Sequence, residues 1–399
     1  MIRAVVAALL VSLVLPGPAH ALHRRTPALV QVTPMSGAGS VANPSWSGFR
    51  FMSFDSDADI IGNGNSTRQI FVFDLRQRNR DGSLAITQVT SGAGDYSHAT
   101  TARRARKVAY DGLDGGGVRQ IFFANRKTGA LTPVTAGTAD SKNPRLDEVG
   151  RVMVFESEAD FFGTGETGSQ IYLVEFRATD PSCPFPCAAN GNAGLTQITN
   201  KSGNNHSAST SKAGKTIAFE SDADLLGTGE TGNQIYVRDE SGTIILFSSG
   251  PGTGHHVSLS RNGRQVAFDS DSDLANTSST GRQIFMQRRL GQPLEQMTTA
   301  AGGASREASV STRGRQVSFV SEDDLAGLGS SGPELFVLNT RRGTIEQVTN
   351  GTSTIITQPK HSTGVFSAFI ADGDLLGNGT SGIALYLVNL FQLGSATVP

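Results

Sequence analysis

Cysteine, tryptophan and charged residues are scarce in this chain of 399 residues. The sequence contains two Cys, one Trp and 17% charged residues, with 34 basic against 35 acidic side chains. This near-neutral balance, spread along the chain, argues against a general attraction to nucleic acid or to an anionic membrane. No run of 18 apolar residues occurs, so no membrane anchor is expected in the mature protein.

Motifs of known catalytic chemistry are also missing. The sequence has no Gly-x-Ser-x-Gly elbow and no His-Glu-x-x-His zinc motif. The Gly-rich run at 114–118 lacks the Lys-Ser or Lys-Thr of a phosphate-binding loop. We therefore predict no catalytic residue, and an enzyme is the less favoured interpretation.

The first 21 residues have the pattern of a secretory signal. Arg3 supplies a positive charge, residues 4–15 are apolar except for Ser12, and Ala19-His20-Ala21 forms a cleavage site. We expect cleavage after Ala21 and a periplasmic or extracellular protein. In such an oxidising compartment Cys183 and Cys187 are expected to form a disulfide rather than a redox or zinc site.

A phrase of about 50 residues recurs seven times. An apolar strand ends in an aromatic residue, an acidic turn follows, and a second strand opens with Gln-Ile-aromatic in most copies. The aromatic anchors of the seven copies are Phe54, Tyr110, Phe155, Phe219, Phe268, Phe319 and Phe369. A Gly-Arg-x-Val type of strand start precedes several anchors, and a Leu-Thr-Gln-Val-Thr type of strand follows the second strand.

Each unit holds four short β-branched runs separated by Gly, Asn, Asp and Ser, which is typical of strands joined by turns. Four strands in this period describe one blade of a β-propeller. We therefore predict an all-β, seven-bladed propeller over residues 22–390, with four antiparallel strands (A to D) per blade and a C-terminal tail at 391–399. A β-solenoid is the weaker alternative.

The two ends of the chain favour a closed ring. The seventh unit has no D strand, and residues 29–33, Leu-Val-Gln-Val-Thr, match that strand at the other terminus. Gln31 lies 23 residues before Phe54, close to the spacing in the other units. We predict that this N-terminal strand pairs into the last blade and removes an open sheet edge.

The repeats resemble those of TolB-like β-propellers. The resemblance rests on Asn43-Pro44-Ser45-Trp46-Ser47-Gly48 and on residues 260–268, Ser-Arg-Asn-Gly-Arg-Gln-Val-Ala-Phe, followed by Gln283-Ile284-Phe285. It covers nearly all of residues 27–388 but concerns the blade alone. The N-terminal α/β domain of the family's namesake has no room here, so the chain is not expected to be that protein.

The resemblance implies that the loops joining D to A and B to C open on one face, around the central channel. The B-to-C loops carry acidic pairs in Asp-x-Asp spacing. These side chains close turns in one interpretation and bind Ca²⁺ in the other; no other cofactor is expected. The candidate ligands are Asp57, Asp59, Asp160, Asp222, Asp224, Asp271, Asp273, Asp324, Asp372 and Asp374, with Glu158 and Glu322 completing two pairs.

Five His residues, including His361, are expected at the starts of A strands and hence at the channel mouth. Imidazoles there suit metal binding or proton transfer, whereas the alternative is a polar ring that merely solvates the channel. The candidate binding residues on this face are His98, Asn143, His206, His255, His256, Glu307 and Gln358.

Two functions remain open. The first is a secreted or periplasmic, monomeric scaffold that binds a protein or glycan through this face. The second is a metal-assisted, polysaccharide-active enzyme of the lyase type that uses the His residues at the channel mouth.

Overall fold

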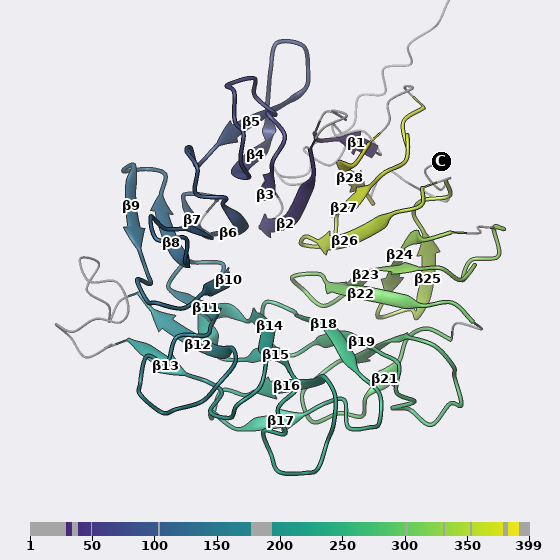
Figure 1. Ribbon diagram of the computed structural model, residues 1–399. Helices are drawn as coiled ribbons and strands as arrows, with labels where there is room; N and C mark the ends of the chain where they lie inside the picture. Colours follow the sequence, from purple (N-terminus) through teal and green to yellow (C-terminus); the bar gives the residue numbers. More distant parts are fainter. Residues whose placement is uncertain are drawn as a thin grey trace, which may run out of the picture.

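The computed structural model describes residues 29–33, 39–48, 50–102, 104–176, 194–299, 302–329, 332–351, 353–377 and 382–390. These residues form seven four-stranded antiparallel sheets arranged as a ring (Figure 1). The prediction of a seven-bladed β-propeller is therefore confirmed. The described residues contain one short 3-10 turn, Lys212–Gly214, and no helix that could cross a membrane.

Six blades use four strands that are consecutive in the chain, and the first strand of each blade lies innermost (Figure 1). Blades 1 to 3 are β2 (Val41–Ser47), β3 (Phe51–Ser56), β4 (Gln69–Arg78) and β5 (Leu84–Gln88); β6 (Ser97–Ala102), β7 (Lys107–Leu113), β8 (Arg119–Asn125) and β9 (Ala130–Pro133); and β10 (Ser141–Leu146), β11 (Val152–Ser157), β12 (Gln170–Glu175) and β13 (Leu195–Gln197). Blades 4 to 6 are β14 (Asn205–Thr210), β15 (Ile217–Ser221), β16 (Gln234–Arg238) and β17 (Ile244–Leu246); β18 (Gly254–Leu259), β19 (Val266–Ser270), β20 (Gln283–Gln287) and β21 (Glu295–Gln296); and β22 (Ser305–Val310), β23 (Gln316–Ser321), β24 (Glu334–Asn339) and β25 (Thr344–Gln347).

The seventh blade joins the two ends of the chain. It contains β26 (Ile356–His361), β27 (Phe366–Ala371), β28 (Ala384–Asn389) and the N-terminal strand β1 (Leu29–Gln31). Val30 pairs with Leu387, and Gln31 pairs with Tyr386. The predicted closure of the ring by the N-terminal strand is confirmed.

The aromatic anchors explain why the phrase repeats. In every blade the anchor on the B strand stacks on the aromatic residue of the C strand, with ring centroids 5.5–5.9 Å apart. Phe219 and Tyr236, for example, are cross-strand partners and are fully buried. Such a pair adds about 0.5–1.5 kcal/mol beyond the apolar area that it buries.

The Gln at the start of the C strand in blades 1 to 5 and the Thr or Ser that follows the D strand form a second repeated unit. In blade 1 the hydroxyl of Thr90 accepts the Ile70 N–H at 2.9 Å and donates to Oε1 of Gln69 at 2.8 Å. The same pair of bonds occurs in blades 2 to 5, with Ser248 in place of Thr in blade 4. These side chains satisfy buried backbone groups where the ladder ends.

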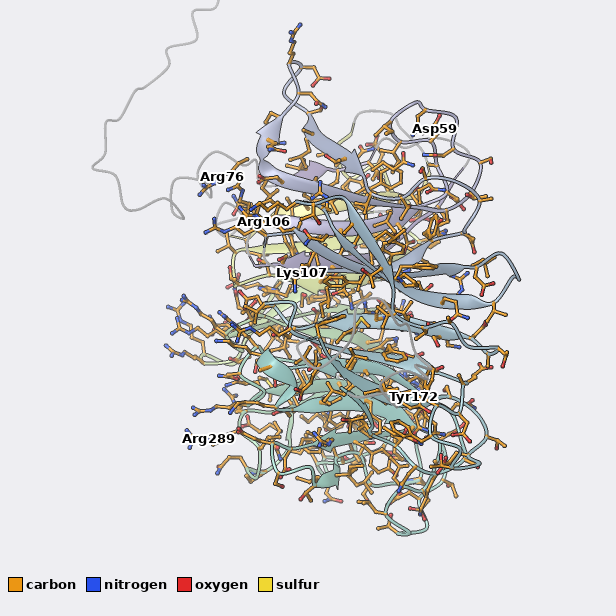
Figure 2. All side chains as sticks on the ribbon, turned by 90° about the vertical axis from the view of Figure 1, so that its left-hand side faces the viewer. Asp59, Arg76, Arg106, Lys107, Tyr172 and Arg289 are labelled. Carbon is orange, nitrogen blue, oxygen red and sulfur yellow. The ribbon has the colours of Figure 1, made fainter. Side chains whose placement is uncertain are left out.

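The loops of the ring lie on two opposite faces with opposite charge. The B-to-C and D-to-A loops contact one another, as where the Asn204 N–H and amide bond to Asp222, and they form what we call the loop face. The A-to-B and C-to-D turns form the other, the turn face (Figure 2). Among the described residues, the loops of the loop face carry 18 acidic and 3 basic side chains, and those of the turn face carry 5 acidic and 17 basic ones.

This segregation corrects one inference from the sequence. The near-neutral net charge is an average over two strongly charged faces, so it does not describe the field that a ligand meets. The absence of nucleic-acid binding stays a prediction. The signal sequence, Cys183, Cys187 and the tail at 391–399 lie outside the described residues.

Candidate functional site

A ring of seven residues in the left-handed backbone conformation surrounds the channel mouth on the loop face. Each lies where the register of an A strand shifts against its B strand, and each has a φ between 51° and 60°. The seven positions, which we call the mouth ring, are Asn43, His98, Asn143, Ser207, His256, Glu307 and Gln358. Non-Gly residues adopt this conformation only where the surroundings hold them in it.

Hydrogen bonds between adjacent blades hold the ring. The backbone N–H of each ring residue donates to a side-chain oxygen of the preceding blade. The N–H of His98 donates to Asp55 at 2.9 Å, for example, and that of Ser207 to Glu156 at 2.7 Å. In blades 1 to 5 the acceptor is the acid that follows the aromatic anchor: Asp55, Asp111, Glu156, Glu220 and Asp269.

Blades 6 and 7 use another acceptor for the N–H of the next ring residue. Val320 and Ile370 stand where the first five blades have an acid. There the side chain of Glu307 accepts the Gln358 N–H, and the side chain of Gln358 accepts the Asn43 N–H at 2.7 Å. The circle of seven bonds is therefore complete.

The five B-strand acids are buried, so they need partners to remain ionised. Burial opposes ionisation of Asp111, but hydrogen bonds and charge from His98, Asn143 and Arg119 outweigh it and lower the pKa of this carboxyl. The pKa of Glu220 is likewise lowered, because three imidazoles offset its burial. Burial prevails at Glu156, where it raises the pKa.

The imidazoles approach these acids through one nitrogen. Nδ1 of His98 lies 2.8 Å from Asp111, and Nδ1 of His256 lies 2.8 Å from Asp269. Nδ1 of His255 and of His206 lie 3.3 and 3.7 Å from Glu220. Although burial opposes it, the Asp269 carboxylate raises the pKa of His256. Each of the four rings thus uses Nδ1 toward a carboxylate, and this pairing fixes its orientation.

The structure places the predicted binding residues in two groups. His98, Asn143, His256, Glu307 and Gln358 belong to the mouth ring, whereas His206 and His255 lie one residue before it. Ser207, which the sequence analysis missed, holds the ring position of blade 4.

The expectation for His361 was wrong. This residue ends β26, where it is 6% exposed, and its Nε2 lies 3.2 Å from Gln316. Burial without a charged partner lowers the pKa of His361 to about 3. It is therefore neutral, and it lines the channel at the end of β26, away from the mouth on the loop face.

The acidic pairs of the B-to-C loops bind backbone N–H groups. Where the first acid of a pair is Asp, it reaches the neighbouring D-to-A loop, as where Asp271 accepts the Thr253 N–H. Glu158 and Glu322 instead form ion pairs with Lys142 and Arg306 of the A strands. The second closes its own loop: Asp224 accepts the N–H groups of Thr228 and Gly229 at 2.9 and 2.8 Å, and these bonds lower its pKa. Asp59, Asp160, Asp273 and Asp324 accept two N–H groups in the same way.

These bonds match the turn-closing interpretation of the pairs. Within the described part of the chain, no group of three or more His, Cys, Asp or Glu side chains is arranged to hold a metal ion. Binding of Ca²⁺ by these loops stays a prediction.

A second ring lies two residues further along each A strand. Its hydroxyls join adjacent blades, as where Ser309 accepts the His361 N–H at 3.0 Å and Ser258 accepts the Val310 N–H at 3.1 Å. Blades 3 and 7 have Arg145 and Lys360 at this position, and both side chains line a channel of about 580 Å³ together with the mouth ring. Neither cation was among the residues predicted for this face.

Of three comparisons with known proteins, only the comparison with solved structures gives matches. No model of a known protein family matches the sequence, and no curated protein matches it either. Among solved structures, an oligogalacturonate lyase in complex with manganese is similar, with a TM-score of 0.61 and 13% identity over 91% of this chain and 93% of that chain. An oligogalacturonate lyase from Vibrio parahaemolyticus gives a TM-score of 0.60 and 12% identity with the same coverage.

TolB-like propellers are also among the similar structures. TolB from Acinetobacter baumannii is 17% identical over 70% of this chain and 58% of its own, with a TM-score of 0.44. At 12–13% identity, the likeness to the two lyases shows the propeller fold alone.

Proposed function

We propose that the protein is a non-catalytic propeller that binds a protein partner through the loop face. Following the predicted signal sequence, it acts in the periplasm or outside the cell, as a monomer. The acidic loops surround a mouth ring whose charged groups are engaged with one another, which leaves the face suited to recognition rather than to proton transfer.

One observation carries this proposal: most of the exposed large apolar side chains lie on the loop face, among its acidic loops. Among the described residues, six of the eight exposed large apolar side chains lie on the loop face. They are Ile61, Phe162, Leu226, Leu328, Ile355 and Leu376, with exposed fractions of 42–50%.

Exposed apolar groups among charges are a common feature of protein interaction surfaces. The loop face would suit a partner that offers basic side chains to the acidic loops and apolar recesses to their tips. A neutral glycan could donate hydroxyl hydrogen bonds to these acids but offers them no positive charge, so a protein partner with basic side chains is favoured over a glycan.

Site-specific photo-cross-linking in the producing cell tests this proposal. A photo-reactive residue replaces Leu226 or Leu376 on the loop face, and the matched control carries it at Leu131, which is 57% exposed on the outer strand β9. We expect one discrete cross-linked protein from each loop-face position and none from Leu131.

The partner is then identified, and its affinity for the variants Leu226→Ser and Leu131→Ser is compared. A loss of about tenfold or more for Leu226→Ser alone would support the proposal. Equal cross-linking at all three positions, or none, would refute it.

A metal-assisted lyase is the second candidate, and one observation favours it. The Nδ1 contacts of His98 and His256 with buried carboxylates leave Nε2 free to ligate a metal, and metal-binding imidazoles commonly have such partners. The acidic loop face argues against it, because it would repel an acidic oligosaccharide.

A direct assay separates the two candidates. The purified protein is incubated with Mn²⁺ and oligogalacturonate, and absorbance of an unsaturated product is followed. Turnover that disappears in His98→Ala and His256→Ala would replace the binding proposal with the lyase.

A further inference from the structure

We propose that the central channel is an oxyanion-binding site, formed by Arg145 and Lys360 and entered from the turn face. Its ligand is an elongated small molecule that carries carboxylate or phosphate groups. This site lies on the other side of the mouth ring from the proposed protein-binding surface, and the inference does not depend on that surface.

Arg145 and Lys360 are two unpaired cations enclosed by the ring of blades. They occupy equivalent positions of β10 and β26, where the other five blades have Ser or Thr. No hydrogen bond or ion pair joins either side chain to another described residue, although both are half-buried and line the same channel. Trp46 lines the same channel, and its indole N–H donates to the Lys360 carbonyl at 2.8 Å.

The acidic groups near these two cations do not offset the cost of their burial. Burial and the charge of Arg145 lower the pKa of Lys360 to about 8, against the weaker opposing effect of Glu307. Burial also lowers the pKa of Arg145, although Glu156, Asp111 and Asp55 act in the opposite direction. Unpaired cations in an enclosed space are unfavourable until an anion joins them, so a bound oxyanion would relieve this cost.

A positively charged cavity on the turn face adjoins the channel. This cavity of about 820 Å³ shares Glu148, Lys212, Arg261 and Thr312 with the channel. This cavity is lined by seven cations: Lys212, Lys215, Arg261, Arg288, Arg313, Arg315 and Arg341.

Some of these cations have acidic neighbours. Arg261 pairs with Glu148, Lys215 with Glu240, and Arg288 with Glu295. The remaining four have no ion pair with a described residue. At the opposite mouth an anion would instead meet the acidic loops, so the field favours entry from the turn face.

The dimensions and the donors define the ligand class. Channel and cavity each fall within the usual range of small-ligand sites, roughly 300–1,000 Å³. Arginine offers a planar fork that binds carboxylate or phosphate by two parallel hydrogen bonds, and lysine adds a point charge. A linear molecule with several oxyanion groups could therefore contact the channel cations at one end and the cavity cations at the other.

Trp46 provides the test, because it is the single tryptophan of the chain and lines the channel. Its fluorescence is followed while citrate, inorganic triphosphate or uncharged maltotriose is added at low ionic strength. We expect saturable changes with at least one of the two anions and none with maltotriose. Binding of citrate alone assigns carboxylates, binding of triphosphate alone assigns phosphates, and binding of both assigns oxyanions in general.

Variants show whether the channel cations hold the anion. Arg145→Met and Lys360→Met are each expected to weaken binding by about 10- to 100-fold, as for the loss of a charged hydrogen bond. Arg145→Lys retains the charge and should recover part of the affinity. Lys201→Met, on the loop face, serves as the control and should bind as tightly as the parent protein.

Two results would overturn the proposal. One is the absence of saturable binding of either anion to the folded parent protein. The other is unchanged affinity in Arg145→Met and Lys360→Met when circular dichroism shows that both variants are folded. Neither result bears on cross-linking at the loop face, so this inference and the proposed function fail separately.

Discussion

Replacing Thr33 by valine tests whether the N-terminal strand stabilises the ring as a D strand should. The Thr33 hydroxyl accepts the N–H of Leu385 at 3.0 Å, and both residues are buried. Valine has nearly the same shape but no acceptor, so the Leu385 N–H would lose its hydrogen-bond partner. A buried, unsatisfied donor costs about 1–3 kcal/mol, which is the expected decrease in the free energy of unfolding.

The chain itself supplies the control for this change. Ser248 performs the same role in blade 4, where its hydroxyl accepts the Ile235 N–H at 2.8 Å. Thr33→Ser should therefore keep the bond and lose only a buried methyl group, at about 0.8 kcal/mol.

The assay is urea unfolding followed by Trp46 fluorescence. This residue reports on the joint between the first and last blades, because its ring stacks on Phe366 at 6.2 Å and its N–H reaches Lys360. We expect Thr33→Val to unfold at lower urea than both the parent protein and Thr33→Ser. If Thr33→Val is as stable as Thr33→Ser, the bond to Leu385 does not contribute to closure and the reasoning is refuted.

Three further predictions concern charge and metal. In buffer without polyvalent anions, Lys360→Met should raise the free energy of unfolding by up to about 3 kcal/mol at pH 7, because the pKa of Lys360 falls from 10.5 to about 8 on folding. This gain should shrink as the pH rises from 8 to 10.5. Urea titrations that show no gain in stability would contradict the prediction. Because the pKa of His256 is raised on folding, its protonation should stabilise the fold fully below pH 6.5, and this effect should be lost as the pH rises through the folded pKa. The difference in the free energy of unfolding between the parent protein and His256→Asn should therefore level off to a constant value at alkaline pH in the same titrations, and NMR can follow the titration of the imidazole. Thermal midpoints in excess EDTA and in millimolar Ca²⁺ should differ by no more than a few degrees, since the loop carboxylates already accept N–H groups such as those of Thr228 and Gly229; a larger shift would favour the Ca²⁺ interpretation.

The blade could be predicted because its stabilising contacts recur in the sequence. A stacked pair such as Phe219 and Tyr236 and a bonded pair such as Gln69 and Thr90 each need a fixed residue type at a fixed strand position. Seven copies make these requirements visible without any structure. The recurrence of the Leu-Thr-Gln-Val-Thr phrase likewise marks residues 29–33 as the missing D strand.

The mouth ring was only partly predictable. Acids such as Asp111 and Glu220 directly follow the aromatic anchor, and a charge inside an apolar strand was a signal that the sequence analysis did not use. The strand register was the harder part. The left-handed residue that shifts it can be almost any polar type, so nothing in the sequence separates Ser207 from the adjacent His206.

The charged faces show why a repeat protein cannot be judged by its net charge. Each blade places its B-to-C loop on one face and its A-to-B turn on the other, so a preference of one acid or one base per loop is multiplied around the ring. A net charge of -1 for the whole chain therefore coexists with 18 acidic side chains on one set of described loops and 17 basic ones on the other.

The electrostatic fields of the two faces would act on different partners. The acidic face would attract a basic protein and repel small anions, whereas the basic face would draw those anions toward Arg145 and Lys360. One propeller could in this way hold two ligands of opposite charge at the two ends of a single channel.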